Sequence, residues 1–259
     1  MSASRIAAAI LALAFAFMLG PFLVIFVSAF SDDDAMVFPP TAYSLRWLRQ
    51  VLTGPDFRAS FLVSLELGVA ATCAALMLGI PAAYALTRHR FAASGAIRAL
   101  LTTPIIVPGI VVGLGLLQYL VVPVNAPVML GLFLAHTALL IPYAVRVVSA
   151  SLDNLPADIE DAAVVLGATR LQAFLRIVVP NIRGGIIAAF VLAFITSFNQ
   201  VPVSLFLAGP GVSTLPIELL HYTELNFDPG TAAVSFLLAL FSVLLVYAAE
   251  RGLGLSRYL

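Results

Sequence analysis

Three carboxylates lie close together in a polar segment of residues 151–183 of an otherwise apolar chain. Asp158, Glu160 and Asp161 follow Pro156. A proline suits the first turn of a helix, and the helix dipole favours negative charge there. The spacing predicts a short helix whose acidic edge can pair with arginine or lysine side chains of another surface.

The same segment carries signals for a bend and a second helix. Gly167 stands where a helix can end in a left-handed backbone, Thr169 and Gln172 form a Thr-x-x-Gln capping box, and Pro180 is expected to stop the second helix. Two small residues, Ala162 and Ala163, lie beside the acidic edge and would let another surface approach. The alternative is a solvated connector lying on the bilayer surface.

A second group of polar residues lies inside an apolar stretch. Asn199 and Gln200 form its centre, with Ser197 and Ser204 nearby. Polar groups inside a membrane are costly, and they either line a transport path or form hydrogen bonds between helices. Both interpretations are open for these four residues, whereas His136 is expected to be a hydrogen-bonded packing residue.

The chain carries no catalytic or nucleotide-binding motif. All thirteen basic residues are arginines, so a phosphate-binding loop that ends in Gly-Lys cannot occur. There is no His-Glu-x-x-His or Gly-x-Ser-x-Gly pattern, no metal-spaced histidine pair and no net charge that would favour nucleic acid. We expect neither an enzyme nor a cofactor or metal, and any ATP-derived energy must come from another chain.

Composition shows which elements must position these residues. The chain is 62% hydrophobic and only 10% charged, with a mean hydropathy of +1.08, whereas soluble domains carry about 25% charged residues. The uncharged stretches are long enough for helices that cross a bilayer, which need about 20 apolar residues. We predict an all-α integral membrane protein, one transmembrane domain over residues 1–259, with six helices at about 6–30, 62–86, 99–121, 128–149, 184–207 and 230–249.

Two details of this division rest on local sequence. The third uncharged stretch, 99–145, is too long for one helix, and the turn signal at 122–127 divides it into a hairpin. Within its first half, Gly109 and Gly113 form a Gly-x-x-x-Gly pair that suits close helix packing. The first apolar run has 25 residues, longer than the core of a cleaved signal peptide, so it is expected to stay as an anchor.

Arginine placement predicts the orientation. With the amino terminus inside, ten of the thirteen arginines face the cytoplasm and three face outward, as the positive-inside rule requires. Both termini and the polar segment 151–183, between the fourth and fifth helices, are then cytoplasmic. The outer loop 31–60 contains Trp47, and its aromatic residues suit a short helix at the level of the lipid headgroups.

The polar inner segment resembles a known motif. Glu160-Asp161-Ala162-Ala163, three residues, Gly167, nine residues and Ile177-Val178-Val179-Pro180 resemble the Glu-Ala-Ala loop of binding-protein-dependent ABC importer permeases. Asp161 replaces the glutamate and Val179 a leucine. The resemblance implies that this segment is a coupling helix, which docks into a cleft of a cytoplasmic ATPase subunit.

Other stretches extend the resemblance over nearly the whole chain. Residues 101–115, 197–211 and 250–258 resemble the second permease subunit of polyamine-type importers. This implies a bacterial inner-membrane permease that forms the path for a small organic, polyamine-like solute. The implied partners are a cytoplasmic ATPase dimer, a second and different permease subunit, and a periplasmic or lipid-anchored solute-binding protein. Asn199-Gln200 stands where relatives often carry an acid, so a neutral or zwitterionic amine is also open.

Two other classes of protein were weighed against the permease. An ion-coupled secondary transporter of small amines or amino acids would show intramembrane acids and broken helices in both halves of the chain. Buried acids are nearly absent here, and no internal repeat is visible. An intramembrane enzyme would need catalytic residues that the chain lacks.

Overall fold

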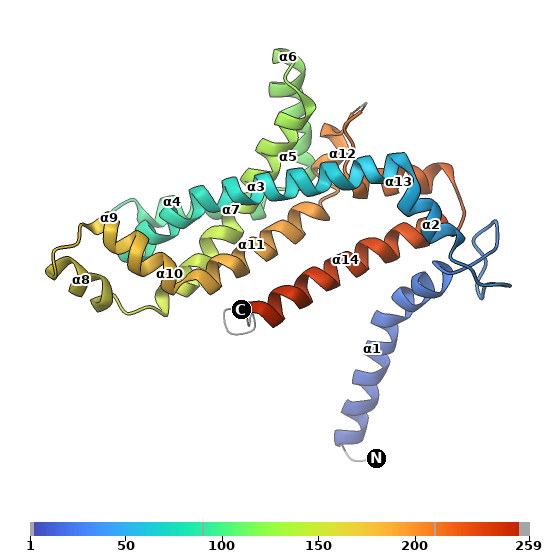
Figure 1. The fold of residues 1–259 in the computed structure, drawn as a ribbon, viewed down its shortest axis with the longest axis horizontal. Coiled ribbons are helices and arrows are strands. Elements are labelled where there is room, and N and C mark those ends of the chain that lie inside the picture. The colour runs from blue at the N-terminus through green and yellow to red at the C-terminus, as the bar shows by residue number, and fades with distance from the viewer. Residues whose placement is uncertain (1–2, 90, 210, 254–259) are drawn as a thin grey trace. The chain divides into compact units, whose positions relative to one another are not determined.

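The computed structural model describes residues 3–89, 91–209 and 211–253, and Figure 1 shows that the described chain is built from helices. Within it the only extended pairings are two isolated β-bridges. Arg90 and Arg257, which entered the orientation prediction, and the end of the stretch 250–258 lie outside the described residues. The α-helices are α1 (Ala3–Ser28), α2 (Arg46–Thr53), α3 (Pro55–Arg88), α4 (Ser94–Thr102), α5 (Gly109–Leu116), α6 (Val122–Val124), α7 (Val128–Asp153), α8 (Asp158–Val165), α9 (Arg170–Ala173), α10 (Val179–Asn181), α11 (Arg183–Phe198), α12 (Ser204–Leu207), α13 (Leu215–Leu225) and α14 (Gly230–Leu253).

Four helical segments are long and apolar enough to cross a membrane, namely Ala7–Ser28, Pro55–Arg88, Val128–Asp153 and Gly230–Arg251. Two further pairs of helices qualify only together, because each pair is bent at a short break. The first joins Ser94–Ile105 to Gly109–Val124 at 91°, and the second joins Arg170–Asn181 to Arg183–Phe198 at 70°. The all-helical membrane architecture is confirmed, and the predicted six spans correspond to counting each bent pair once.

The third predicted span, 99–121, is not one straight helix. The 3₁₀ segment η1 (Thr103–Ile105) follows α4 and contains Pro104, and Pro108 stands just before α5. A proline lacks a backbone donor and restricts the residue before it, so this pair of prolines ends one helix and begins another. The predicted turn at 122–127 is present, with Asn125 in the left-handed conformation at φ 50°.

One compact unit comprises residues 60–217 together with the end of α14 from Leu244. Its core is formed by α3, α7 and α11, and Figure 1 shows α7 and α11 side by side. Small residues dominate the contact: Ala83 of α3, Ala144 of α7 and Ala189 of α11 are fully buried. At Gly79 of α3, a Cβ atom would lie 2.5 Å from the Cβ of Ala144. Small side chains therefore let these helices approach closely, as is common in membrane bundles.

The second compact unit comprises residues 1–59 and Glu218–Val243. In it Phe26 of α1 and Phe30, just after this helix, pack on Phe236 of α14, with ring centroids 5.2 and 5.5 Å from that of Phe236. The rest of α1 is covered by almost nothing in this chain, because its apolar side chains from Ile10 to Phe26 are mostly exposed. Such a helix needs lipid or another subunit around it.

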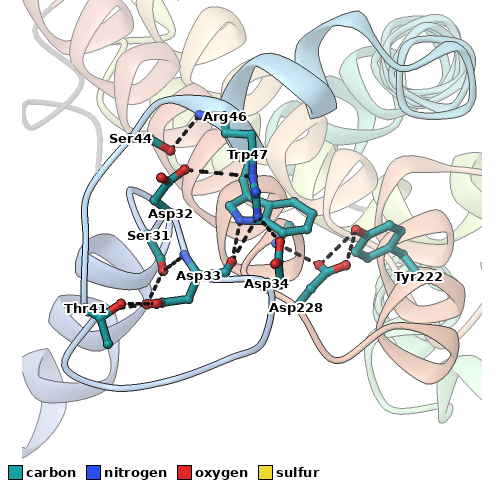
Figure 2. A network of polar contacts seen from close by, with 11 residues as sticks. Ser31, Asp32, Asp33, Asp34, Thr41, Ser44, Arg46, Trp47, Tyr222 and Asp228 are labelled. Carbon is teal, nitrogen blue, oxygen red and sulfur yellow. Dashed lines mark hydrogen bonds and ion pairs between the residues drawn. The ribbon is translucent and has the colours of Figure 1, made fainter.

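The outer loop in this unit is organised around Asp33, as Figure 2 shows. The backbone N–H of Thr41 donates to the Asp33 carboxylate at 3.0 Å, and the Thr41 hydroxyl donates to its other oxygen. Trp47 Nε1 and Arg46 both donate to the Asp33 carbonyl oxygen, at 3.1 and 3.2 Å. These contacts position the start of α2, the short helix that the sequence predicts near Trp47.

Two further contacts of this unit involve a carboxylate. The Tyr222 hydroxyl lies 2.9 Å from both carboxylate oxygens of Asp228, and burial together with this hydrogen bond raises the pKa of Tyr222. Arg46 pairs with Asp34 at 2.7 Å. The first pair joins α13 to the segment before α14, and the second joins the start of α2 to the loop before it.

Acidification should loosen the outer loop, and Trp47 can report it because it is the only tryptophan. The hydrogen bond from the Thr41 hydroxyl, the largest cause, lowers the pKa of Asp33 below its ordinary value of 3.8. A depressed pKa means that the contact stabilises the loop above pH 3.8 and is lost as the pH falls through the lower, folded value. We expect Thr41→Val to move the acid transition of Trp47 fluorescence to higher pH.

Thr53→Val is the matched control, because the Thr53 hydroxyl bonds only carbonyl groups of its own helix α2. Its acid transition should coincide with that of the unmodified chain. A transition that is the same in all three proteins would show that Thr41 does not hold Asp33 in its charged form.

Candidate functional site

The first helix of the polar segment after α7 and the bend that follows it form as the sequence predicts. Helix α8 ends beside Gly167, which has φ +96°. The N–H of Ala168 donates to the carbonyl of Ala163, and the N–H of Gly167 to that of Val164, both at 3.0 Å. This pair of bonds is the Schellman motif, in which a glycine supplies the left-handed residue.

The second helix of the segment begins as predicted and ends differently. Thr169 and Gln172 form the capping box, with each side chain bonded to the backbone N–H of the other. Pro180 was expected to stop this helix, yet it lies within α10, whose last residue is Asn181. The π segment η3 (Phe174–Val178) precedes it, and a wider turn accommodates a residue that has no N–H to donate. The sharp change of direction follows Asn181.

Glu160 is buried inside the chain instead of standing on an exposed acidic edge. Only 5% of its surface is exposed, and it accepts a hydrogen bond from the hydroxyl of Tyr84 on α3. Arg88 Nε lies 4.0 Å and Arg170 Nη1 3.9 Å from its carboxylate oxygens. A buried carboxylate needs such partners, so Glu160 ties α8 to the end of α3.

Tyr84 and Arg88 are functional candidates that the sequence analysis did not find. They stand more than 70 residues before Glu160, and no local pattern indicates that they meet it. Arg88 also donates to the carbonyl of Leu155 at 2.7 Å, in the connection between α7 and α8. The two residues hold the inner segment against the bundle from the same turn of α3.

The exposed part of α8 carries two carboxylates, Asp158 and Asp161, and becomes apolar toward its end. Asp161 is exposed and pairs with Arg170 at 2.7 Å. Ala162 beside it is exposed, and Ala163 faces inward and is buried. Past these residues, Val165 is 86% and Leu166 88% exposed. The end of the helix therefore presents two large apolar side chains that nothing in this chain covers.

The fifth predicted span, 184–207, is interrupted in the middle. Helix α11 ends at Phe198, and α12 begins only at Ser204. Asn199 is the C-cap residue, and its side-chain nitrogen donates to the carbonyl of Ile195 at 3.1 Å. Pro202, which cannot donate, lies within the break. Asn199 is half-buried, Gln200 is half-buried as well, and both stand at the point where the helical backbone stops.

His136 of α7 holds the two sides of this break together. Its Nδ1 lies 2.7 Å from the hydroxyl of Ser197, before the break, and its Nε2 lies 3.0 Å from the hydroxyl of Ser204, after it. All three side chains are buried. His136 is the hydrogen-bonded packing residue that the sequence predicts, and both predicted serines are its partners.

The other side of the break is covered by α5. A Cβ atom on Gly113 would lie 2.6 Å from the carbonyl oxygen of Val203, and one on Gly109 would lie 3.1 Å from the Cβ of Pro202. The predicted Gly-x-x-x-Gly pair thus packs against the interrupted backbone itself. Residues 199–203 lie between a glycine face on one helix and a histidine on another.

No group of three or more metal-ligating side chains occurs among residues 3–89, 91–209 and 211–253. The polar groups around the helix break at 199–203 are amides, hydroxyls, an imidazole and backbone groups, and the buried carboxylate of Glu160 lies in the segment after α7. Amides and hydroxyls can both donate and accept hydrogen bonds. Such an arrangement suits transient contacts with a passing solute or a change of helix position.

Comparison with known proteins gives concordant results. Residues 75–253 match the family model described as binding-protein-dependent transport system inner membrane component. The putrescine transport system permease protein PotI of Escherichia coli K12 is 32% identical over 236 residues, which are 88% of this chain and 84% of that protein. The sulfate transport system permease protein CysT of Salmonella typhimurium is 30% identical over 230 residues, 83% of each chain.

The fold also occurs in a solved structure. A chain of a bacterial ABC transporter involved in the import of the acidic polysaccharide alginate superimposes with a TM-score of 0.70 at 17% identity. The match covers 96% of this chain and 95% of that one. The likeness extends over the whole arrangement of helices.

Replacing His136 should destabilise the break without unfolding the helices. His136→Leu leaves the buried hydroxyls of Ser197 and Ser204 without their partner, and we expect the free energy of unfolding in detergent to fall by about 1–2 kcal/mol. His136→Gln keeps a donor and an acceptor and should lose less. Thr196→Val is the control, because that hydroxyl bonds only the carbonyl of Leu192 in its own helix. Equal stability of His136→Leu and Thr196→Val would contradict the bridging role.

Proposed function

Because the chain belongs to the family of binding-protein-dependent transport system inner membrane components, we propose that it is one membrane-spanning permease subunit of an ABC importer. It is a transport component and not an enzyme, and the ATPase is a separate subunit. It crosses the membrane six times, each bent pair of helices being one span, and both termini are cytoplasmic. The family match over residues 75–253 carries the proposal, and it leaves the ion-coupled alternative without support.

The partners follow from the same proposal. A second, different permease subunit forms the transport path together with this chain, a cytoplasmic ATPase dimer supplies the energy, and a periplasmic or lipid-anchored binding protein delivers the solute. The largely uncovered apolar surface of α1 is compatible with contact to another subunit. ATP binding would favour one of two arrangements of the permease pair, because the ATPase binds that arrangement better.

We place the docking contact with the ATPase at the exposed end of α8. Val165 and Leu166 offer apolar surface, and Asp161 with Ala162 forms the adjoining edge. Glu160 has a different task in this proposal, because its carboxylate faces Tyr84 and Arg88 of α3. A displacement of α8 is thereby passed to α3, one of the three core helices.

Charges placed on this apolar end should uncouple transport. In proteoliposomes that contain the whole complex, we expect Val165→Asp with Leu166→Asp to lower ATP-dependent uptake at least tenfold, because two charges would have to be buried in the ATPase cleft. Uptake by the unmodified complex should stop without ATP and survive an ionophore. Val165→Ile with Leu166→Met keeps the surface apolar and should transport normally.

Two results would refute this assignment. Normal ATP-driven uptake by the double aspartate variant would mean that the end of α8 does not dock. Uptake that persists without ATP and collapses with an ionophore would indicate an ion-coupled transporter.

For the solute we propose a small polyamine-like amine. A putrescine permease is among the similar proteins, but so is a sulfate permease, so relatives transport solutes of opposite charge. The break at 199–203 carries neutral groups, and Asn199 and Gln200 can accept from an amine without holding it tightly. Most of the selectivity then lies in the binding protein. Ser197 and Ser204 support the path through His136.

Removing both amides should slow transport. Asn199→Leu with Gln200→Leu is expected to reduce uptake several-fold at matched expression, while the affinity of the binding protein for its solute stays the same. Thr196→Val, one turn earlier in α11, is the control and should transport normally. Unchanged uptake by the double leucine variant would mean that these amides pack helices and do not line the path.

A further inference from the structure

A cavity of about 500 Å³ lies between the start of the first bent pair of helices, Ser94–Ile105, and the end of α7. One wall is formed by α4 and η1, which contribute Arg98 and Ile105, and Ile106 follows directly. The other wall is the last two turns of α7. All of these residues belong to the compact unit that begins at Ser60, and none belongs to the helix break at 199–203 or to α8.

Three charged side chains line the cavity and are poorly satisfied by the protein. Arg146 and Asp153 make no hydrogen bond or ion pair with the residues that the structure describes. Arg98 makes one, a bond of 3.3 Å to the carbonyl of Leu86, and a guanidinium has five N–H donors. Arg98, Arg146 and Asp153 are exposed, so their charged groups can be reached by a ligand that enters the cavity.

A buried hydroxyl adds an independent sign of a missing partner. Ser149 lies between Arg146 and Asp153 on the same face of α7, since positions three and four apart are neighbours on a helix. Its residue is 5% exposed, its Oγ has no hydrogen-bond partner, and it lines the cavity. Buried polar groups are normally satisfied, so the cavity has donors and an acceptor that await a ligand.

We propose that this cavity binds the head group of a glycerophospholipid, with phosphatidylethanolamine the best match. The phosphodiester lies between the guanidinium groups of Arg98 and Arg146, which suit phosphate oxygens. Ser149 donates a hydrogen bond to it, and Asp153 accepts one from the ammonium group. The ligand thus matches both positive and negative groups of the wall.

The apolar part of the cavity favours a lipid over a soluble phosphate ester. Ile106 is 80% and Ile105 43% exposed, so acyl chains can run along surfaces that water would otherwise meet. The cavity lies at the end of a membrane-crossing helix in an inner-membrane protein, where lipid head groups are found. The proposal uses the family's location in the membrane and does not depend on the direction or solute of transport.

Binding of short-chain phosphatidylethanolamine to the purified full chain in detergent tests the proposal. Arg98→Gln with Arg146→Gln should weaken binding at least tenfold, whereas Arg176→Gln with Arg183→Gln removes the same charge outside the cavity and should leave binding unchanged. Ser149→Ala and Asp153→Asn, each a smaller change that keeps both arginines, should weaken binding a few-fold. These two single variants keep the test valid if the double arginine variant fails to fold.

Three further measurements show whether the head group, the acyl chains or an empty subunit interface accounts for the measured binding. Soluble glycerophosphoethanolamine should bind at least tenfold more weakly than the lipid, and diacylglycerol, which lacks phosphate, should not compete. The lipid should also remain bound in the intact transporter complex. The proposal would be overturned if the soluble head group or diacylglycerol bound as tightly as the lipid, or if the arginine substitutions left binding unchanged. Loss of the lipid when the complex assembles would also overturn it, because another subunit would then fill the cavity.

Discussion

Hydrocarbon offers no hydrogen bonds, so each backbone group within the membrane must find its partner inside the protein. This constraint accounts for the helices and for the place where helical structure is given up. Residues 199–203 interrupt the predicted fifth span, and neighbouring groups enclose the interruption: His136 bridges Ser197 and Ser204, and the glycines of α5 lie close to Val203. Irregular backbone at this depth is stable only when it is enclosed by protein or lines a path.

The need for hydrogen-bond partners also explains how the inner segment is attached to the helices. A carboxylate that leaves water must be paired, and Glu160 meets Tyr84 and Arg88 on α3. One end of α8 is thereby fastened to the bundle, while Val165 and Leu166 at the other end stay open for a partner. Helix α8 therefore has one end held against α3 and one end exposed, which suits a helix that would transmit movement between two proteins.

Charged side chains are satisfied to different degrees in the two compact units. In the outer loop, Asp33 accepts from Thr41, and Arg46 pairs with Asp34, so the charges are satisfied locally. Near the end of α7, Arg146 and Asp153 face a cavity without such partners among the described residues. The hydrogen-bonded charges around Asp33 hold the loop in place, whereas the unpaired charges beside α7 are where we propose that a ligand binds.

Local sequence was sufficient for features that depend on near neighbours. The apolar runs predicted membrane helices, the turn at 122–127 was found, and Gly167 with the Thr169–Gln172 capping box produced the predicted bend. These follow from hydropathy and from bonds that span at most five residues. They needed no knowledge of which helices lie together.

Tertiary structure decided everything that depends on distant partners. The acidic edge at 158–161 looked uniform in sequence, yet Glu160 turned inward because Tyr84, 76 residues earlier, lies beside it, whereas Asp161 stayed exposed. For the serines near Asn199 the sequence left path lining and hydrogen bonding between helices both open, and the structure shows that His136 lies within hydrogen-bond distance of both hydroxyls. The helices also break at Pro108 and after Phe198, and the glycines of α5 lie close to the backbone of the second break. A sequence pattern shows that a residue is polar, but only the packed structure shows which atom satisfies it.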